Sequence, residues 1–298
     1  MSAHPSRARP ARAVAAGFVL AAALSGCAPC APSAQFAPAH AHALPAPIAM
    51  GINVAVGSLA GGETVSVLGT GLEAVDRVTF GGQDSPSVVV VSPTRVDVIV
   101  PSSHTFVDGP VPVAIYASAG SAPIVEVRHL EYLYRSRSAV DRQLEYAFAH
   151  WNNYTLADYG DFTSWGGDCM NFVSQTLVAR GWPVTSDWYN NAQEDWAAAF
   201  VDVPSFIDWL DAHPERGATK LTLAQRNQVK VGDLVMFDWN NDGSYDHAQV
   251  VSAVHVVDGV TRISMVGHDI DTDFRDVDDA LATEGQSGAT AFFWSLPA

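Results

Sequence analysis

Cys169 is the residue whose type and setting point most directly to chemistry. The stretch "GGDCMNFVSQ" sets it at the first turn of a predicted helix that runs to about Arg180, with apolar side chains on one face. Two glycines let the backbone approach a ligand closely, and Asp168 can cap the free amides. Because a helix N-terminus favours negative charge, this position stabilises the thiolate, which is the nucleophilic form.

The chain has three cysteines, of which Cys27 and Cys30 lie close together near the N-terminus. Cys169 is therefore the one cysteine of the predicted globular part, and a disulfide within that part is excluded. A lone cysteine in an exported protein is either a buried small hydrophobe or a reactive thiol. The neighbouring glycines and acid favour the reactive thiol.

A thiolate nucleophile needs a proton donor for its leaving group, and two histidines are candidates. His247 opens the predicted strand "AQVVSAVHV", and His268 follows the predicted strand "ISMVG". If these strands pair antiparallel, both imidazoles emerge at the same end of the sheet. The spacing therefore predicts a Cys–His site that a third polar group orients.

The loop "DWNNDGSYDH" before His247 allows two interpretations. Asp238, Asn240, Asp242 and Asp246 fall at positions 1, 3, 5 and 9 of a calcium loop, but position 12 is a glutamine where an EF-hand has glutamate. The run "NDG" between apolar segments is also strong hairpin chemistry without metal. We expect the loop to deliver His247 either as a tight turn or with a weak calcium site.

The composition describes an acidic, globular chain with room for two domains. It has 298 residues, 48% of them hydrophobic, and a formal net charge of -16 at pH 7. Such acidity disfavours nucleic acid as a partner. It also repels anionic wall polymers, so contact with a cell wall would use local pockets or bridging cations.

The N-terminus reads as an export signal over residues 1–26. Three arginines precede an apolar run at 13–24 that is too short to span a bilayer, and "LSGC" ends at Cys27. This ending resembles the lipobox of bacterial lipoproteins, which implies acylation of Cys27 and a membrane anchor by lipid only. The alternative is an ordinary signal peptide with a chance cysteine. Residues 27–47, rich in Ala, Pro and His, predict a spacer.

Residues 48–134 carry short alternating runs at intervals of about ten residues, the pattern of an antiparallel β-sandwich. The segment resembles an IPT/TIG domain, an immunoglobulin-like module. The resemblance rests on "GGETV", "LGTGL", "VTFGG", "SPT", "VIVP" and the closing tyrosines Tyr132 and Tyr134. It implies a fold and says little about function, since such modules act as spacers or adhesive units.

Residues 135–298 change to helical periodicity followed by strands, which predicts a separate α+β domain. From about Val140 this part resembles the putative amidase domain family, a relative of the papain-like and NlpC-type cysteine hydrolases. The resemblance rests on "WNNY", "GGDCMNFVSQ", "GW" and "GDLV" followed by "DWNNDGSYDHAQVV". The stretch "GHDIDTDFRD" departs from the Thr-containing segment that the family pattern leads us to expect.

The resemblance implies roles for individual residues. Cys169 is the expected nucleophile, His247 the general base and acid, and His268 the orienting residue, with Asp269 as a rival for that third role. The oxyanion hole is expected to use the Cys169 amide and one side chain, for which Tyr159 is a weak candidate.

The sequence thus predicts a lipid-anchored cysteine hydrolase on the extracellular face of a bacterial membrane. Its expected substrate is an amide bond in peptidoglycan peptides, and no cofactor is required. A transferase that passes the same acyl group to an amine would use the same residues. The alternative from another class is an adhesin or binding protein with a degenerate amidase domain.

Overall fold

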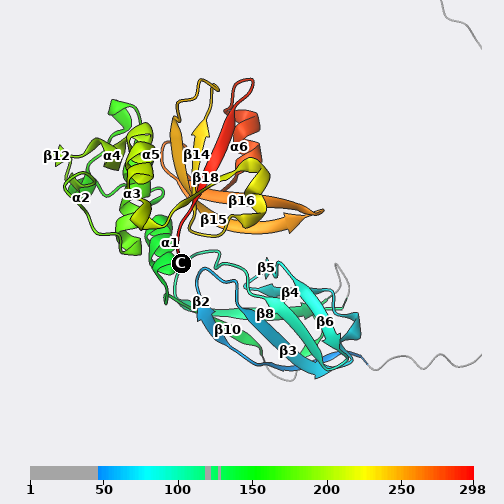
Figure 1. Cartoon of the computed structure of the whole chain (residues 1–298). Helices are drawn as coiled ribbons and strands as arrows, with labels where there is room; N and C mark the ends of the chain where they lie inside the picture. Colours follow the sequence, from blue (N-terminus) through cyan, green and yellow to red (C-terminus); the bar gives the residue numbers. More distant parts are fainter. Residues whose placement is uncertain (1–45, 118–121, 127–128) are drawn as a thin grey trace, which may run out of the picture. The chain divides into compact units, whose positions relative to one another are not determined.

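The computed structural model describes residues 46–117, 122–126 and 129–298. The predicted signal peptide 1–26, Cys27 and most of the predicted linker 27–47 lie outside the described residues. The described residues all belong to one compact unit, Leu44–Ala298, and Figure 1 traces it from the blue N-terminal strands to the red C-terminal strand.

The alternating runs before residue 136 form strands in two sheets. Their orders are β6-β7-β3-β1-β9 and β2-β10-β8-β4-β5. The strands are β1 (Ile48–Ile52), β2 (Val56–Ser58), β3 (Thr64–Thr70), β4 (Arg77–Phe80), β5 (Gln83–Asp84), β6 (Val88–Ser92), β7 (Arg95–Ile99), β8 (Gly109–Tyr116), β9 (Val125–Glu126) and β10 (Glu131–Arg135), with a short 3-10 helix at Leu72–Ala74.

Alternation along these strands decides which side chains enter the core. β7 buries Val96 and Val98 and turns the residues between them outward, as expected for a strand with one face covered. β10 likewise buries Tyr132 and Tyr134, and the Tyr134 hydroxyl donates to the carbonyl of Pro101 at 2.8 Å. The closing tyrosines of the sequence pattern therefore lie inside this β-rich region.

The rest of the chain combines helices with further strands. The helices are α1 (Ala139–His150), α2 (Leu156–Tyr159), α3 (Cys169–Arg180), α4 (Ala198–Val201), α5 (Val203–Ala212) and α6 (Val277–Thr283), with 3-10 turns at Thr163–Trp165, Pro214–Arg216 and Leu223–Gln228. The strands are β11 (Asn190–Asn191), β12 (Asp195–Trp196), β13 (Thr219–Thr222), β14 (Leu234–Asp238), β15 (His247–Val257), β16 (Val260–Gly267), β17 (Thr272–Asp276) and β18 (Thr290–Ser295).

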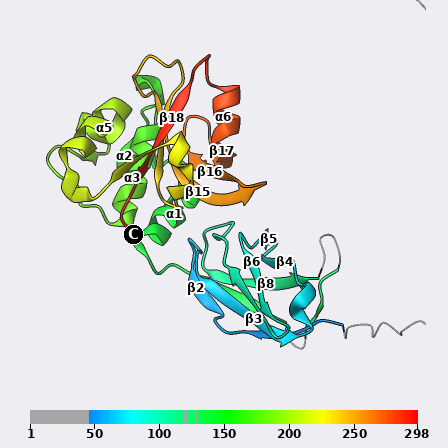
Figure 2. The same ribbon diagram turned by 45° about the vertical axis from the view of Figure 1, so that its right-hand side comes forward.

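Six of these strands form one antiparallel sheet with helices on both faces. Its order is β13-β18-β14-β15-β16-β17, and Figures 1 and 2 show α3 and α5 on one side and α6 on the other. β14 is buried on both faces, so its sequence "LVMFD" is continuously apolar until its last residue. Met236 packs on the side of α3, and Phe237 packs on the side of α6.

The two strand ends that carry the histidines lie at the same end of the sheet. β15 and β16 pair antiparallel, with Val250 opposite Val266, which fulfils the condition of the sequence-based prediction. His247 is the first residue of β15, and His268 comes directly after β16. α3 packs against β15, which sets the start of this helix beside that end of the sheet.

α1 begins where the first region ends, at a capping box. The Ser138 side chain accepts from the Asp141 amide, and the Asp141 carboxylate accepts in return from the Ser138 amide. Asp141 is fully buried and also accepts from the Ser58 hydroxyl at 2.6 Å and the Ala60 amide at 2.8 Å.

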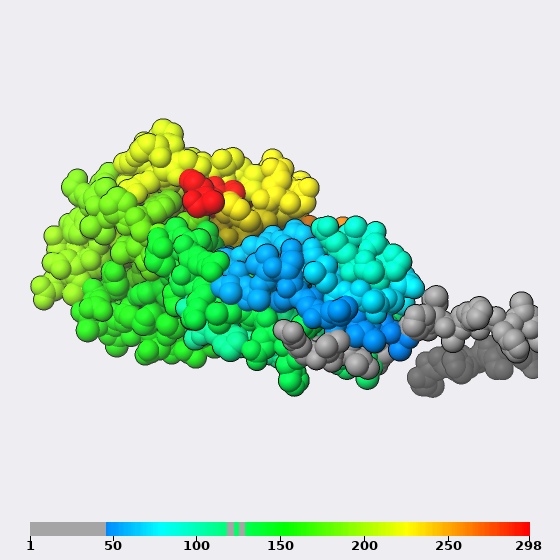
Figure 3. Space-filling model, turned by 90° about the horizontal axis from the view of Figure 1, so that it is seen from below, coloured from blue at the N-terminus to red at the C-terminus, as the bar shows by residue number. Residues whose placement is uncertain are grey.

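Within the described part of the chain, none of the helices has the length and apolar character needed to cross a bilayer. The last two residues, coloured red in Figure 3, are exposed at the surface.

Candidate active site

Cys169 occupies the first position of α3 and is 5% exposed. The backbone amides of Met170, in its own helix, and of Ala248, in β15, favour the negatively charged form of its sulfur. The predicted helix start is thus present, and the sulfur faces the end of the sheet where His247 stands.

The free amides at the start of α3 are capped by a residue about a hundred positions away. Asp269 Oδ2 accepts from the amides of Asp168 at 2.6 Å and Cys169 at 2.8 Å. Its other oxygen, Oδ1, is buried and has no hydrogen-bond partner within the described residues. The carboxylate therefore occupies the amide pair to which a substrate carbonyl oxygen would be expected to bind.

The approach of Asp269 depends on backbone conformations that few residues tolerate. Asp269 itself has a φ of 71°, in the left-handed region that aspartate adopts more readily than most residues. Gly167 has a φ of 137°, and a Cβ there would stand 2.7 Å from Asp269 Oδ2. The second glycine of the "GGDC" stretch therefore makes room for this carboxylate.

His247 lies next to both residues. One ligand atom each of Cys169, His247 and Asp269 falls within 4.8 Å of the other two. The His247 ring is 6% exposed, and neither ring nitrogen makes a hydrogen bond among the described residues. Burial, with a smaller contribution from the positive charge of Arg275, lowers the pKa of His247 to about 4.

The pKa of the Cys169 thiol is shifted in the direction opposite to the one predicted. Burial, and secondarily the Asp269 carboxylate, raises the pKa of Cys169 to about 12. The expectation of a thiolate activated by the helix start is therefore wrong for this conformation, because desolvation and a like charge outweigh the two amides that face the sulfur. Cys169 and His247 lie together here as a neutral thiol and a neutral imidazole.

The structure places His268 with Asp168 instead of His247. Its Nδ1 lies 2.6 Å from Asp168 Oδ2, and its Nε2 lies 2.9 Å from the carbonyl of His150. The ring stacks between Tyr154 and Phe172, with centroids 3.7 and 4.0 Å away, and is 1% exposed. Since both nitrogens are engaged, His268 does not orient His247 in this geometry.

Asp168 was predicted to cap the helix, and the structure gives its carboxylate other partners. Oδ2 faces His268, while Oδ1 accepts from the amide of Phe162 at 2.9 Å and from the side chain of Asn171 at 2.9 Å. Asp168 thus points away from the sulfur and fixes the loop before α3, while the cap comes from Asp269.

The contacts of Tyr159 are with residues other than Cys169. Its ring stacks on Phe200 at a centroid distance of 5.9 Å, and its carbonyl accepts from Asn190. The donors that the structure offers beside the sulfur are the backbone amides of Asp168 and Cys169. Tyr159 as an oxyanion donor therefore stays a prediction, and in this structure its ring stacks on Phe200 of α4.

The loop between β14 and β15 forms a network of side chain to backbone turns. Asp238 accepts from the amides of Asp242 and Gly243, Asp242 accepts from the amide of Ser244, and Asp246 accepts from the amide of Trp239. Asn240 contributes a further bond to Asp242.

These oxygens serve the loop's own backbone, in keeping with the turn interpretation. Among the described residues, the acids of this loop do not converge as a metal-ligand group, whereas Cys169, His247 and Asp269 do. The calcium interpretation of Asp238, Asn240, Asp242 and Asp246 therefore gains no structural support.

Gln249 is a further candidate for this site, for which the sequence pattern predicted no catalytic role. It follows His247 by two positions on β15, so both side chains leave the strand on the same face. Gln249 is fully buried, and both its amide nitrogen and its amide oxygen lack partners within the described residues. A glutamine one strand repeat from the histidine was the available signal.

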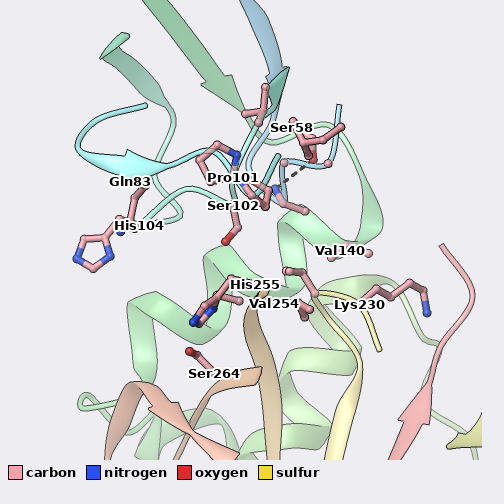
Figure 4. Close-up of a pocket in the computed structure, with 18 of the residues that line it drawn as sticks. Ser58, Gln83, Pro101, Ser102, His104, Val140, Lys230, Val254, His255 and Ser264 are labelled. Carbon is pink, nitrogen blue, oxygen red and sulfur yellow. Dashed lines mark hydrogen bonds between the residues drawn. The ribbon is translucent and has the colours of Figure 1, made fainter. Parts of the chain in front are cut away.

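A separate pocket lies elsewhere. It has a volume of about 870 Å³, and Figure 4 shows His104, Lys230, His255 and Ser264 among the side chains that line it. None of Cys169, His247 and Asp269 lines this pocket, so it contributes no group to the cysteine site.

Comparison with protein families gives two matches that divide the chain. A family described as "Putative amidase domain" matches residues 134–294, which is more than half of the chain, and the IPT/TIG domain matches residues 47–124. The second match corresponds to the β-rich region, and the first contains every residue of the candidate site.

Among curated proteins, the chain is similar to the uncharacterized protein YhbB of Bacillus subtilis. The two are 27% identical over 116 residues, which is 37% of this chain and 35% of YhbB. The match thus spans about a third of the relative's length.

Two solved structures have low overall similarity. They are an auxiliary nutrient binding protein from Bacteroides thetaiotaomicron (20% identity, 30% of this chain and 21% of that chain, TM-score 0.22) and SGBP-B of the Bacteroides ovatus mixed-linkage glucan utilization locus, in complex with a heptasaccharide (9%, 84% and 50%, TM-score 0.25). At these TM-scores the likeness supports no inference about function.

Proposed function

Because this chain belongs to the Putative amidase domain family, we propose that it is a cysteine hydrolase that cleaves amide bonds, with Cys169 as nucleophile and His247 as general base and acid. The observation that carries the proposal is the convergence of a helix-start cysteine and a buried histidine within 4.8 Å of each other. Proton transfer needs nucleophile and base within hydrogen-bond reach, about 2.6 to 3.2 Å, so the two side chains would close the remaining gap when substrate binds.

The reaction would run through a thioester. The Cys169 sulfur attacks the substrate carbonyl carbon while neutral His247 takes the thiol proton. The resulting imidazolium then gives that proton to the leaving amine as the carbon–nitrogen bond breaks. A water molecule, deprotonated by His247, hydrolyses the thioester and restores the thiol with release of a carboxylic acid. A transferase reaction would replace this water with an amine.

The amide pair of Asp168 and Cys169 would hold the substrate oxygen during these steps. For that to occur, Asp269 must leave the amides, since its Oδ2 accepts from both of them in this conformation. Its departure would also remove a negative charge from beside the sulfur and so lower the cost of forming a thiolate. Substrate entry and activation of the nucleophile would then be the same event.

The polar group that orients His247 would be either Asp269 or Gln249. Asp269 has a buried, unpartnered Oδ1 and lies within 4.8 Å of the His247 ring, while Gln249 shares a strand face with His247. His268 is better placed to hold the loop before α3, through its contact with Asp168. A papain-like site, as the resemblance implied, would have one such polar group beside its histidine.

We extend the proposal to substrate and location on the strength of the sequence. The substrate class is the peptide portion of peptidoglycan, and the protein is anchored outside the cell through acylated Cys27. The acidity of the chain supports a neutral or cationic peptide in preference to an anionic polymer.

The decisive experiment is mass spectrometry of muropeptides after incubation with the purified protein. We expect new amine and carboxylate ends with the wild type, and none with Cys169→Ala, which removes the nucleophile and little packing. Cys30→Ser removes a thiol outside the proposed site and should leave cleavage unchanged. Identical product patterns for wild type and Cys169→Ala would refute the mechanism.

A second candidate function is that of a surface binding protein whose amidase domain is inactive. The closed amide pair and the neutral thiol and imidazole favour it, because a site that never opens could not catalyse. Reactivity of the thiol separates the two candidates, since a permanently closed site would keep Cys169 unreactive even in the presence of cell-wall peptides.

A further inference from the structure

Three donor atoms of different chemical type converge at the start of α3 with their bonding capacity partly unused. Ligand atoms of Cys169, His247 and Asp269 lie within 4.8 Å of one another. In a tetrahedral zinc site with bonds of about 2.0 to 2.3 Å, neighbouring donors stand roughly 3.5 Å apart. Side-chain rotations that close about an ångström would therefore bring all three atoms onto one ion.

Two of these side chains have polar atoms without a hydrogen bond among the described residues. The His247 ring is more than nine-tenths buried and has no hydrogen bond at either nitrogen among the described residues. Asp269 Oδ1 is buried and unpartnered in the same part of the chain. A buried polar atom without a partner is costly, and a cation would satisfy Asp269 Oδ1 while it also binds the His247 ring.

The surroundings would hold these ligands in the right orientation. Asp269 Oδ2 accepts from the amides of Asp168 and Cys169, which fixes the carboxylate while leaving Oδ1 available. The amides of Met170 and Ala248 favour the charged form of the Cys169 sulfur and would help to hold it as a thiolate. Such bonds to the ligands' remaining atoms are typical of the outer shell of metal sites.

We propose that Cys169, His247 and Asp269 Oδ1 bind a zinc-type divalent cation, and that the bound ion blocks the hydrolase site. A thiolate, an imidazole and one carboxylate oxygen are a donor set that suits zinc and leaves a fourth position for water. Inhibition rests on the proposed function, because the metal would occupy the sulfur that attacks and the nitrogen that moves the proton. Binding itself does not depend on that function.

Cobalt is a suitable probe, because Co²⁺ bound to a thiolate gives a charge-transfer band that zinc removes on displacement. The measurement uses the full chain with Cys27→Ser and Cys30→Ser, so that Cys169 is its single thiol. The N-terminal segment also carries His40 and His42, so comparison of variants, instead of the wild-type affinity alone, decides the result.

We expect the band in the parent protein, its loss in Cys169→Ser, and at least about a 10-fold weaker affinity for zinc in Asp269→Asn. Asp271→Asn is the matched control, since Asp271 lies two residues further on in the same turn and accepts from the Tyr154 hydroxyl. Its affinity should equal the parent's. Circular dichroism and the urea midpoint establish that each variant is folded.

The cobalt band and the cleavage assay distinguish the two proposals. A band that persists in Cys169→Ser, or equal zinc affinities for Asp269→Asn and Asp271→Asn, would overturn the metal site whether or not the protein cleaves peptides. A band with the expected variant pattern supports the site even if no cleavage is found. Cleavage that continues at zinc concentrations saturating the cobalt-competition curve would overturn the inhibition.

Discussion

The carboxylate of Asp269 and the sulfur of Cys169 share one helix terminus. Asp269 Oδ2 accepts from the Cys169 amide at 2.8 Å, so the negative charge that caps the helix stands beside the side chain that would need to become negative. The helix start can stabilise one anion there fully, and in this conformation the carboxylate takes that place. The reactivity of the cysteine should therefore be controlled by the aspartate.

We expect Asp269→Asn to accelerate alkylation of Cys169. The amide keeps the shape of the side chain but removes the like charge that helps to raise the pKa of the thiol. A fall of about one pKa unit would increase the thiolate fraction, and with it the rate of iodoacetamide labelling at pH 8, about 10-fold. The rate is measured by mass spectrometry on protein with Cys169 as its single thiol.

The same experiment includes two references. Native wild-type protein should react more slowly than the same protein unfolded in urea, because burial is the larger cause of the raised pKa. Asp271→Asn should label at the wild-type rate. If Asp269→Asn and Asp271→Asn were equally slow, the carboxylate would have no influence on the sulfur.

Stability should fall on the acid side because of His247. Its pKa in the folded protein is lowered from 6.5 to about 4. Between these pH values the unfolded chain binds a proton at His247 and the native state does not. The contribution of this group is fully present above pH 6.5 and is lost as the pH falls toward 4, an effect of about 3 kcal/mol. Urea unfolding from pH 7.5 to 4 should show a shallower decline for His247→Gln than for the wild type.

His255→Gln provides the control for that series, since His255 lies on the same strand but is exposed. Its acid limb should follow that of the wild type. Parallel declines for His247→Gln and the wild type would mean that the native state accepts the proton and that the imidazole is more accessible than the structure indicates.

We expect His268→Ala to damage the fold more than the chemistry. His268 and Asp168 form a buried pair at 2.6 Å with both side chains 1% exposed, and removing one partner of such a pair costs roughly 3 to 5 kcal/mol. His150→Ala is the matched control, because it keeps the carbonyl that faces His268 Nε2. A variant with unchanged urea midpoint but strongly reduced turnover would restore the orienting role predicted from the sequence.

Much of the framework of this site follows from sequence patterns. The helix at Cys169–Arg180 was predicted, although it is buried on nearly all sides and not on one face only, and the antiparallel pairing of β15 with β16, on which the histidine prediction depended, is present. This pairing places the two histidines at the same end of the sheet.

The assignment of partners could not be predicted in the same way. His268 and Asp269 are adjacent, yet one side chain meets Asp168 and the other meets the helix amides, and the choice depends on the left-handed backbone at Asp269. The prediction of a lowered pKa for Cys169 failed for a related reason. A local argument from the helix start omitted burial and a carboxylate a hundred residues away, both of which are tertiary effects.

Gln249→Met should show whether Gln249 orients His247 or only packs in the sheet. Methionine matches glutamine in length and lacks branching, which matters because Gly267 packs close to the Gln249 side chain. Since neither atom of the Gln249 amide has a partner within the described residues, removing the amide should leave stability unchanged or raise it by about 1 kcal/mol. We expect turnover to fall at least about 10-fold with KM little changed, because in the proposed open site the Gln249 amide, unpaired here, would hold the His247 ring.

The pH profile of kcat/KM gives a second measure, since a loosely held imidazole should also shift the pKa that governs the acid limb. Ser252→Ala is the control, as Ser252 is another fully buried polar residue of β15 whose hydroxyl lacks a partner in the described structure. It should keep both turnover and the pH profile. Equal turnover for Gln249→Met and Ser252→Ala would make Gln249 a packing residue and leave Asp269 as the group beside His247.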